Sequence, residues 1–395
     1  MTDTRDDIWN EGEEKRAVPK RPSRLRRFLI FFLVLVAVLG VVLIAAWRDG
    51  TGFDALRRLI SYGGGEDGVQ AVTYQYDASS QNRFAVVEDS LAVLSGSSLQ
   101  LMDKSGKEAW TTSVNMASPA LDAGGGRAVA YDVGGTDLYV LDADGLVYDL
   151  QADEAEPLIA ANLNAKGWLA VTAERKNYKG AVSVYNAEGK VVFDFKSSQR
   201  FVMDAYVTDD CTTLAAVTLG QEAGTFVSSI VLYDLKEEEP KASYPISNGL
   251  VLGIGQQGDA LVTVSDTKLS FANAKGEELA SYGYGSLYLR GYDFGGDDFT
   301  LLQLNRYRSG SLGRLVTVAQ DGTEIATLDV RDEILSVSAV GRYITVLYTD
   351  RLVIYNRDLQ EYAALNGTGY AREALARADG TAVLLGSEQA ELYLP

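Results

Sequence analysis

Carboxylates are the residues of this chain that could do chemistry, because histidine is absent and cysteine occurs once. The 395 residues contain no histidine and a single cysteine, Cys211. Without histidine there is no Ser-His-Asp or Cys-His nucleophile system, no imidazole zinc ligand and no histidine general base. A single cysteine cannot form an intrachain disulfide. The chemistry left open is hydrolysis of a glycosidic bond by two carboxylates, which needs no histidine.

No pair of carboxylates is singled out by its spacing. Aspartates cluster in the segments 142–145, 209–210 and 295–298, whose oxygens suit Ca²⁺. None of these segments extends to a D-x-[DN]-x-[DN]-G loop with a distal glutamate, and the same residues serve as turn residues without a metal. We therefore predict no enzyme activity, no metal site and no cofactor, with a carboxylate-based glycosidase as the alternative.

Two cationic segments that contain tyrosine are the candidates for a binding site. They read ERKNYKG at 174–180 and NRYRSGSLG at 305–313, in a chain whose net charge is −18. Such a negative chain is not expected to bind nucleic acid by neutralising phosphates. The two segments instead favour an anionic or glycan partner, and the alternative is that they are ordinary solvated hairpin tips. The candidate residues are Arg175, Lys176, Tyr178, Lys179, Arg306, Tyr307 and Arg308.

A repeated hairpin is the element that must position these segments. At 138–150 two short apolar runs of alternating pattern flank an Asp-Ala-Asp-Gly turn, which is typical of a β-hairpin. The same sequence pattern recurs about every 40–45 residues. A repeat of this length that contains only strands is typical of a four-stranded propeller blade. Two copies, at 230–244 and 352–365, lack the glycine. The turn glycines of the other copies are Gly106, Gly145, Gly189, Gly276 and Gly322.

The strand pattern predicts an all-β fold, a β-propeller of about eight four-stranded blades over residues 69–395. Seven blades can be written in full, and residues 369–394 provide three strands of another. Its fourth strand is predicted at 72–77, so that the two ends of the domain share one blade and close the ring. Seven blades with an irregular extra segment are the alternative. The cationic segments then connect second and third strands on one face, three blades apart.

The blade that contains LMDKSGKEAW, at 101–110, resembles the repeat of quinoprotein-like propellers, which are PQQ-like or WD40-like. Enzymes of that group bind pyrroloquinoline quinone and calcium and use a catalytic aspartate. None of those positions can be matched in this chain, so the resemblance implies a non-catalytic relative. The layout of one apolar segment followed by a propeller also resembles a family of bacterial single-pass membrane proteins of unknown function.

The apolar segment is FLIFFLVLVAVLGVVLIAAW at 28–47, which has no charged residue. A helix of this length spans about 30 Å, the hydrocarbon thickness of a bilayer, so the segment predicts one transmembrane helix that acts as an uncleaved signal anchor. A cleaved signal peptide is the alternative. Basic residues gather at 15–27, which predicts a cytoplasmic disordered tail at 1–27 and an extracytoplasmic propeller. Residues 48–68 are predicted to form a juxtamembrane amphipathic helix and a Gly-rich linker.

These patterns together predict a propeller anchored in the cell membrane that acts as a non-enzymatic protein-binding or scaffolding module of the bacterial cell envelope. The expected partners are the membrane, through 28–47, and an envelope protein or glycan. The alternatives are a glycan- or ligand-binding sensor domain and the glycosidase described above.

Overall fold

The structure is a computed structural model that describes residues 24–49, 54, 58, 62, 70–222, 224–246 and 249–395. The chain divides into two compact units, residues 1–56 and 57–395. The first contains the helix α1 (Arg24–Asp49), and the second contains every described strand. Residues 1–23 of the tail predicted at 1–27, and most of the juxtamembrane helix and linker predicted at 48–68, lie outside the described residues; residues 24–27 belong to α1.

The prediction of a transmembrane helix at 28–47 has to be corrected. Among the residues that the structure describes, no helix is both long enough and apolar enough to cross a bilayer. The predicted localisation, a single-pass cell-membrane protein with a cytoplasmic N-terminus and an extracytoplasmic C-terminal domain, is therefore wrong.

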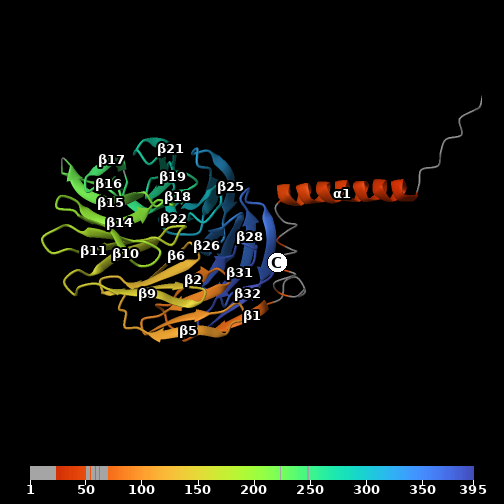
Figure 1. Cartoon of the computed structure of the whole chain (residues 1–395), viewed down its shortest axis with the longest axis horizontal. Coiled ribbons are helices and arrows are strands. Elements are labelled where there is room, and N and C mark those ends of the chain that lie inside the picture. The colour runs from red at the N-terminus through yellow and green to blue at the C-terminus, as the bar shows by residue number, and fades with distance from the viewer. Residues whose placement is uncertain are drawn as a thin grey trace, which may run out of the picture. The chain divides into compact units, whose positions relative to one another are not determined.

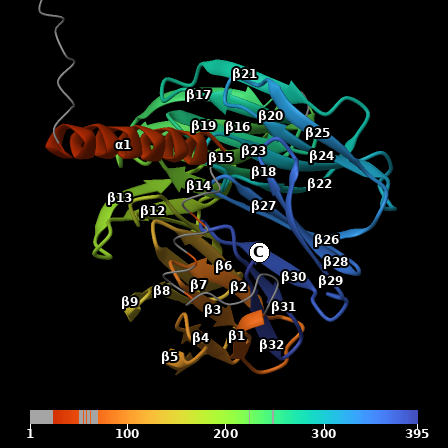
Figure 2. The ribbon, with the colours of Figure 1, turned by 90° about the vertical axis from the view of Figure 1, so that its right-hand side faces the viewer.

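The second unit is an all-β propeller of eight four-stranded blades, so the predicted fold class is confirmed and the seven-blade alternative is excluded (Figures 1 and 2). Blade 1 comprises β2 (Arg83–Val87), β3 (Ser90–Leu94), β4 (Ser98–Met102) and β5 (Glu108–Ser113), and blade 2 comprises β6 (Pro119–Gly124), β7 (Arg127–Asp132), β8 (Asp137–Asp142) and β9 (Gly145–Gln151). Blade 3 comprises β10 (Leu158–Leu163), β11 (Leu169–Ala173), β12 (Ala181–Tyr185) and β13 (Val191–Lys196), and blade 4 comprises β14 (Phe201–Val207), β15 (Thr213–Glu222), β16 (Thr225–Asp234) and β17 (Pro240–Ile246).

The remaining blades follow the same order. Blade 5 comprises β18 (Val251–Gln257), β19 (Ala260–Ser265), β20 (Lys268–Ala272) and β21 (Glu278–Gly283), and blade 6 comprises β22 (Tyr288–Asp293), β23 (Thr300–Asn305), β24 (Gly313–Val318) and β25 (Glu324–Val330). Blade 7 comprises β26 (Ile334–Val340), β27 (Tyr343–Tyr348), β28 (Arg351–Asn356) and β29 (Glu361–Asn366), and blade 8 comprises β30 (Glu373–Ala376), β31 (Ala382–Leu385), β32 (Gln389–Tyr393) and β1 (Gln70–Gln75).

Blade 8 closes the ring with strands from both ends of the propeller, as the sequence predicts. The strand β1 pairs antiparallel with β32, with Tyr74 opposite Ala390, and Figure 1 shows the two strands side by side. Tyr74 and Tyr76 are buried in an apolar cluster that joins blade 8 to blade 1. The pairing covers an edge that would otherwise expose unpaired backbone groups.

The repeated hairpin turn has a local cause. In blade 3 the side chain of Asn186 accepts hydrogen bonds from the backbone N–H groups of Glu188 and Lys190, and Gly189 has a φ of 75°. A glycine adopts this left-handed conformation without the steric cost that a Cβ imposes. In blade 7, which lacks the glycine, Leu359 adopts a φ of 55° at the corresponding position.

The turn glycines also leave room for aromatic side chains of the preceding blade. A Cβ added to Gly189 would lie 2.8 Å from Cγ of the Tyr148 ring, and one added to Gly145 would lie 3.3 Å from Cγ of Trp110. These aromatic residues lie on the outer, fourth strands, so the contacts join neighbouring blades at the rim. The apolar core itself lies between the blades, as in the cluster formed by strands of blades 5 and 6.

The strand order defines two faces of the ring. The first strand of each blade lines the central channel, and it begins on the face that also carries the turns between second and third strands. We name this the top face and the other the bottom face. On the top face of blade 3, Lys179 donates its backbone N–H to the carbonyl of Ser197 in the connection to blade 4, over 2.7 Å. Turns and connections therefore form one continuous surface.

Two residues that precede β1 bind the bottom face. Arg58 donates a 2.9 Å hydrogen bond to the carbonyl oxygen of Asp379 and a 2.7 Å hydrogen bond to the hydroxyl of Tyr362. Tyr62 contacts the same aspartate, with 3.4 Å between its hydroxyl and Oδ2. Asp379 lies in the turn between the first two strands of blade 8, so these contacts leave the top face uncovered by Arg58 and Tyr62.

Candidate functional site

The first strands of all eight blades line a central cavity of about 580 Å³. Its lining includes the first-to-second-strand turns at Gly125, Ala165, Asp209 and Gly295, so the cavity lies toward the bottom face. A volume of this size is typical of small-molecule sites. Two partly buried aspartates, Asp122 and Asp293, line it as well, and their carboxyl groups have the strongest claim here to acid–base chemistry.

The cavity carboxyls hold neighbouring blades together. Oδ2 of Asp122 accepts a 2.9 Å hydrogen bond from the backbone N–H of Leu163 in blade 3. Oδ2 of Asp293 accepts one of the same length from Ala339 in blade 7, and its Oδ1 accepts a 2.7 Å bond from Gly295. Both oxygens of Asp293 are thus engaged with backbone, which favours a structural role over general acid–base catalysis.

Burial shifts the protonation of these groups. It raises the pKa of Asp122 to about 7 and that of Asp293 to about 6, while the backbone hydrogen bonds act in the opposite direction. Asp204, on the first strand of blade 4, also has its pKa raised by burial, to about 6. Within the described residues no group of three or more His, Cys, Asp or Glu side chains is arranged to hold a metal ion.

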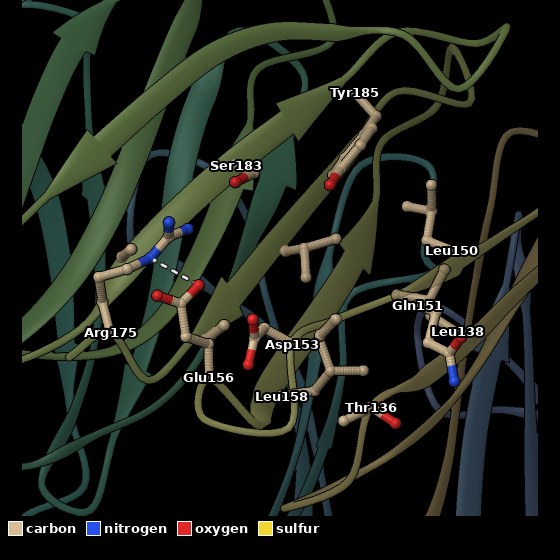
Figure 3. A pocket seen from close by; sticks show the side chains of 14 residues that line it. Thr136, Leu138, Leu150, Gln151, Asp153, Glu156, Leu158, Arg175, Ser183 and Tyr185 are labelled. Atoms are coloured by element: carbon tan, nitrogen blue, oxygen red, sulfur yellow. Dashed lines mark ion pairs between the residues drawn. The ribbon is translucent and has the colours of Figure 1, made fainter.

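The predicted binding residue Arg175 lies in a separate pocket of about 110 Å³, between blades 2 and 3 (Figure 3). Its Nε is 3.2 Å from Oε2 of Glu156, and its Nη2 is 3.8 Å from Oδ1 of Asp194. Figure 3 shows the guanidinium turned toward Glu156 across the pocket. About three-quarters of each side chain in the Arg175–Glu156 pair is buried, so the charge of Arg175 is already compensated inside the domain.

The other candidate residues of the first cationic segment, Lys176, Tyr178 and Lys179, lie exposed at the top face, between β11 and β12. The ammonium of Lys179 is 4.6 Å from the centroid of the Phe201 ring, which belongs to the first strand of blade 4. A cation over an aromatic ring is attracted by the negative face of the ring. Tyr178 is exposed beside it, and neither Lys176 nor Lys179 forms an ion pair within the described part of the chain.

The second cationic segment has the same character. Arg306, Tyr307 and Arg308 lie exposed between β23 and β24 of blade 6, and the guanidinium of Arg308 is 5.4 Å from the ring centroid of Tyr288. Neither arginine forms an ion pair with any described carboxylate. The segments belong to the third and sixth blades on one face, as the strand pattern predicts, and their role in binding stays a prediction.

Exposed apolar side chains gather on the top face, and the repeat pattern alone does not indicate this. Of the large apolar side chains that are exposed in the described propeller, those on or beside the top face are Val133, Tyr178, Phe201, Met203, Phe226, Leu250, Leu252, Tyr288, Tyr307, Leu312, Leu335 and Tyr370. The others lie on the outer strands at the rim and are Leu146, Val191, Val192 and Leu279. A signal was available at 201–203 (Phe-Val-Met) and 250–252 (Leu-Val-Leu), where apolar residues fill consecutive positions.

Solved structures share this architecture at low sequence identity. The C-terminal WD40 domain of Sif2 is 15% identical, with a TM-score of 0.58 over 84% of this chain and 99% of that one. The computationally designed Ika8 protein is 12% identical, with a TM-score of 0.59 over 84% and 100%. BamB from Moraxella catarrhalis is 14% identical, with a TM-score of 0.51 over 83% and 97%. At such identities the likeness shows the fold alone.

The sequence comparisons give a family and no relative of known activity. Residues 68–361 match the profile described as "Family of unknown function (DUF5711)". No curated protein matches the sequence. The predicted resemblance to WD40-like propellers is confirmed at the level of the fold, whereas the PQQ-like type and the single-pass membrane family are not confirmed.

Proposed function

Because the chain belongs to DUF5711, a family of unknown function whose profile covers residues 68–361, we propose its function from geometry: the propeller is a non-enzymatic protein-binding module that binds through its top face. The observation that carries this proposal is the gathering of exposed aromatic and aliphatic side chains on that face. Large exposed apolar patches on soluble domains mark interaction sites.

The composition of the top face suits a protein interface. Tyrosine and arginine are enriched among the residues that dominate binding energy, because they combine large contact area with directed polar groups. Tyr178 and Tyr307 stand exposed at the hairpin tips of blades 3 and 6, and each has unpaired cations beside it. The partner must be broad enough to span blades three apart, which favours a protein over a small metabolite.

The cavity supports the non-enzymatic part of the proposal. A general acid or base must exchange protons with a substrate, yet the carboxyls that line the cavity accept hydrogen bonds from the backbone of neighbouring strands. Their role is to hold the ring. A glycosidase in this cavity would need one carboxylate free of such bonds on each side of a bound sugar.

The test is partner capture with matched surface variants of the full-length protein. Replacing Tyr178, Phe226 and Tyr307 with serine should abolish capture of a defined partner protein without lowering the melting temperature. A rim control, in which Val191, Val192 and Leu279 become serine, should capture as the wild type does. Undiminished capture by the top-face variant would refute the proposal.

A glycan array run with the same proteins separates the alternatives. A sugar that binds and is released unchanged would favour a glycan-binding domain. A sugar whose product changes size would identify a hydrolase. Either result, obtained without a protein partner, would contradict the protein-binding function.

A further inference from the structure

Five consecutive blades carry the same irregularity in the first strand. In blades 3 to 7 the pairing of the first with the second strand shifts by one residue near the top-face end. The pairing of blades 1, 2 and 8 has no such shift. The extra, unpaired residues are Ile159, Met203, Leu252, Arg290 and Leu335.

These bulges place side chains at the mouth of the channel. A bulge leaves its extra residue outside the ladder and redirects its side chain, and bulges are common beside functional sites. Met203, Leu252 and Leu335 are 46%, 53% and 41% exposed, whereas the residues on either side of each in its strand are buried or partly buried. The five residues, named here the mouth ring, thus combine four apolar side chains with one arginine.

The mouth ring and the cationic segments are connected. Lys179 lies over the ring of Phe201, two residues before Met203, and Arg308 lies over the ring of Tyr288, two residues before Arg290. These contacts place both cations beside first strands, in blades 4 and 6. The mouth therefore presents apolar side chains with positive charge beside blades 4 and 6, on a chain whose net charge is −18.

The charge at the mouth lacks a counterpart within the domain. Lys176, Lys179, Arg290, Arg306 and Arg308 make no ion pair with any described carboxylate. Some arginines elsewhere are paired, as Arg351 is with Asp332 at 2.6 Å and Arg377 with Asp89 at 3.0 Å. Uncompensated charge on one face steers and orients a partner of opposite charge.

We propose that the mouth ring is the docking site of an acidic protein segment. The segment inserts large apolar side chains into the part of the channel mouth that is formed by blades 3 to 7. The inference rests on the proposed protein-binding function and names its partner class. The apolar anchors would contact Met203, Leu252 and Leu335, and the carboxylates of the segment would pair with the five cations.

The test begins with a random library of 12-residue peptides displayed on phage and selected on the full-length protein. Enriched sequences should combine Asp or Glu with aromatic or large aliphatic residues. A synthetic, fluorescein-labelled copy of an enriched peptide then serves as the probe for fluorescence anisotropy. Changing Met203, Leu252 and Leu335 to serine should weaken its binding by about 100-fold or more, because buried interface anchors contribute on the order of 1 kcal/mol or more each.

The rim control is matched in number, residue class and exposure. Val191, Val192 and Leu279 are 58%, 39% and 56% exposed, and their change to serine should alter the affinity by less than about twofold. Changing Lys176, Lys179, Arg306 and Arg308 to serine should weaken binding and flatten its dependence on salt. Melting temperatures of all variants establish that each one is folded.

Several outcomes overturn the inference. Enrichment of basic peptides, or a probe that binds the mouth variant as tightly as the wild type, would overturn the docking site. If a probe that binds the mouth variant normally fails to bind the variant with Tyr178, Phe226 and Tyr307 replaced, protein binding by the top face stands, but the mouth ring is not the docking site. Dimerisation of the protein that the mouth variant abolishes would assign the mouth to a second copy of this chain and overturn the acidic segment as its occupant.

Discussion

Closure of the ring by β1 can be tested with one side chain, that of Tyr74. Only 1% of this residue is exposed, and it packs where blade 8 meets blade 1, with Met102 and Leu392 in the same apolar cluster. If β1 did not pair with β32, the tyrosine would be solvated and its replacement would have little effect. Tyr74→Ala therefore measures closure directly.

The expected magnitude follows from burial. Removing a fully buried aromatic side chain costs about 3–5 kcal/mol, the sum of lost transfer energy and the cavity left behind. Tyr178→Ala is the control, because this tyrosine is 46% exposed at a hairpin tip, and its loss should cost no more than about 0.5 kcal/mol. Tyr74→Phe keeps the ring and should cost about 1 kcal/mol.

Urea denaturation followed by tryptophan fluorescence and circular dichroism provides the assay. With a denaturant slope on the order of 3 kcal/mol/M, a loss of 4 kcal/mol lowers the midpoint by about 1.3 M. The exposed edge of β32 should also promote aggregation of Tyr74→Ala near its midpoint. If the midpoints of Tyr74→Ala and Tyr178→Ala agree within about 0.2 M, closure by β1 is refuted.

Three further predictions concern the turns, the channel and the pocket. Gly189→Ala should cost about 1–2 kcal/mol more than Gly134→Ala in urea denaturation, because both glycines have positive φ but only the added Cβ at Gly189 meets a tyrosine ring; equal costs would contradict the contact between blades. Burial raises the pKa of Asp204 from 3.8 to about 6, so the folded protein binds this proton more tightly and loses stability as the pH rises from about 4 to 6. Asp204→Asn, which keeps the acceptor oxygen Oδ1, should flatten that part of the stability profile, and an unchanged slope would assign the titration elsewhere. Arg175→Ser should lower stability by about 1 kcal/mol through loss of its largely buried ion pairs, whereas Lys176→Ser should change it by less than about 0.5 kcal/mol; similar values would contradict the pairing in the pocket.

The sequence by itself determined the architecture of the propeller. Five blades end in a hairpin whose turn is set by local chemistry, an Asp or Asn side chain that binds nearby backbone N–H groups and a glycine that adopts positive φ. Because these signals are local and recur at a constant period, they predict the strand order, the blade number and the unpaired strand at 72–77. The apolar run at 28–47 shows the limit of such reasoning, since its composition predicted a membrane helix that the described part of the chain does not support.

Only the tertiary structure decided which charges and apolar groups are available to a partner. Arg175 reads like the other cations of its segment, yet Glu156 and Asp194 reach it from 19 residues away on either side and compensate its charge. Nothing in the sequence singles out Asp122 and Asp293, yet each binds a strand of the next blade, 41 and 46 residues further along the chain.

The mouth ring depends on register in the same way. Whether Met203 or Leu252 points into the core or out of the ladder is set by a one-residue shift against the second strand, and alternation along one strand does not reveal that shift. Side-chain direction in a sheet is a property of the pair of strands, so the candidate interface emerged only when the strands were paired.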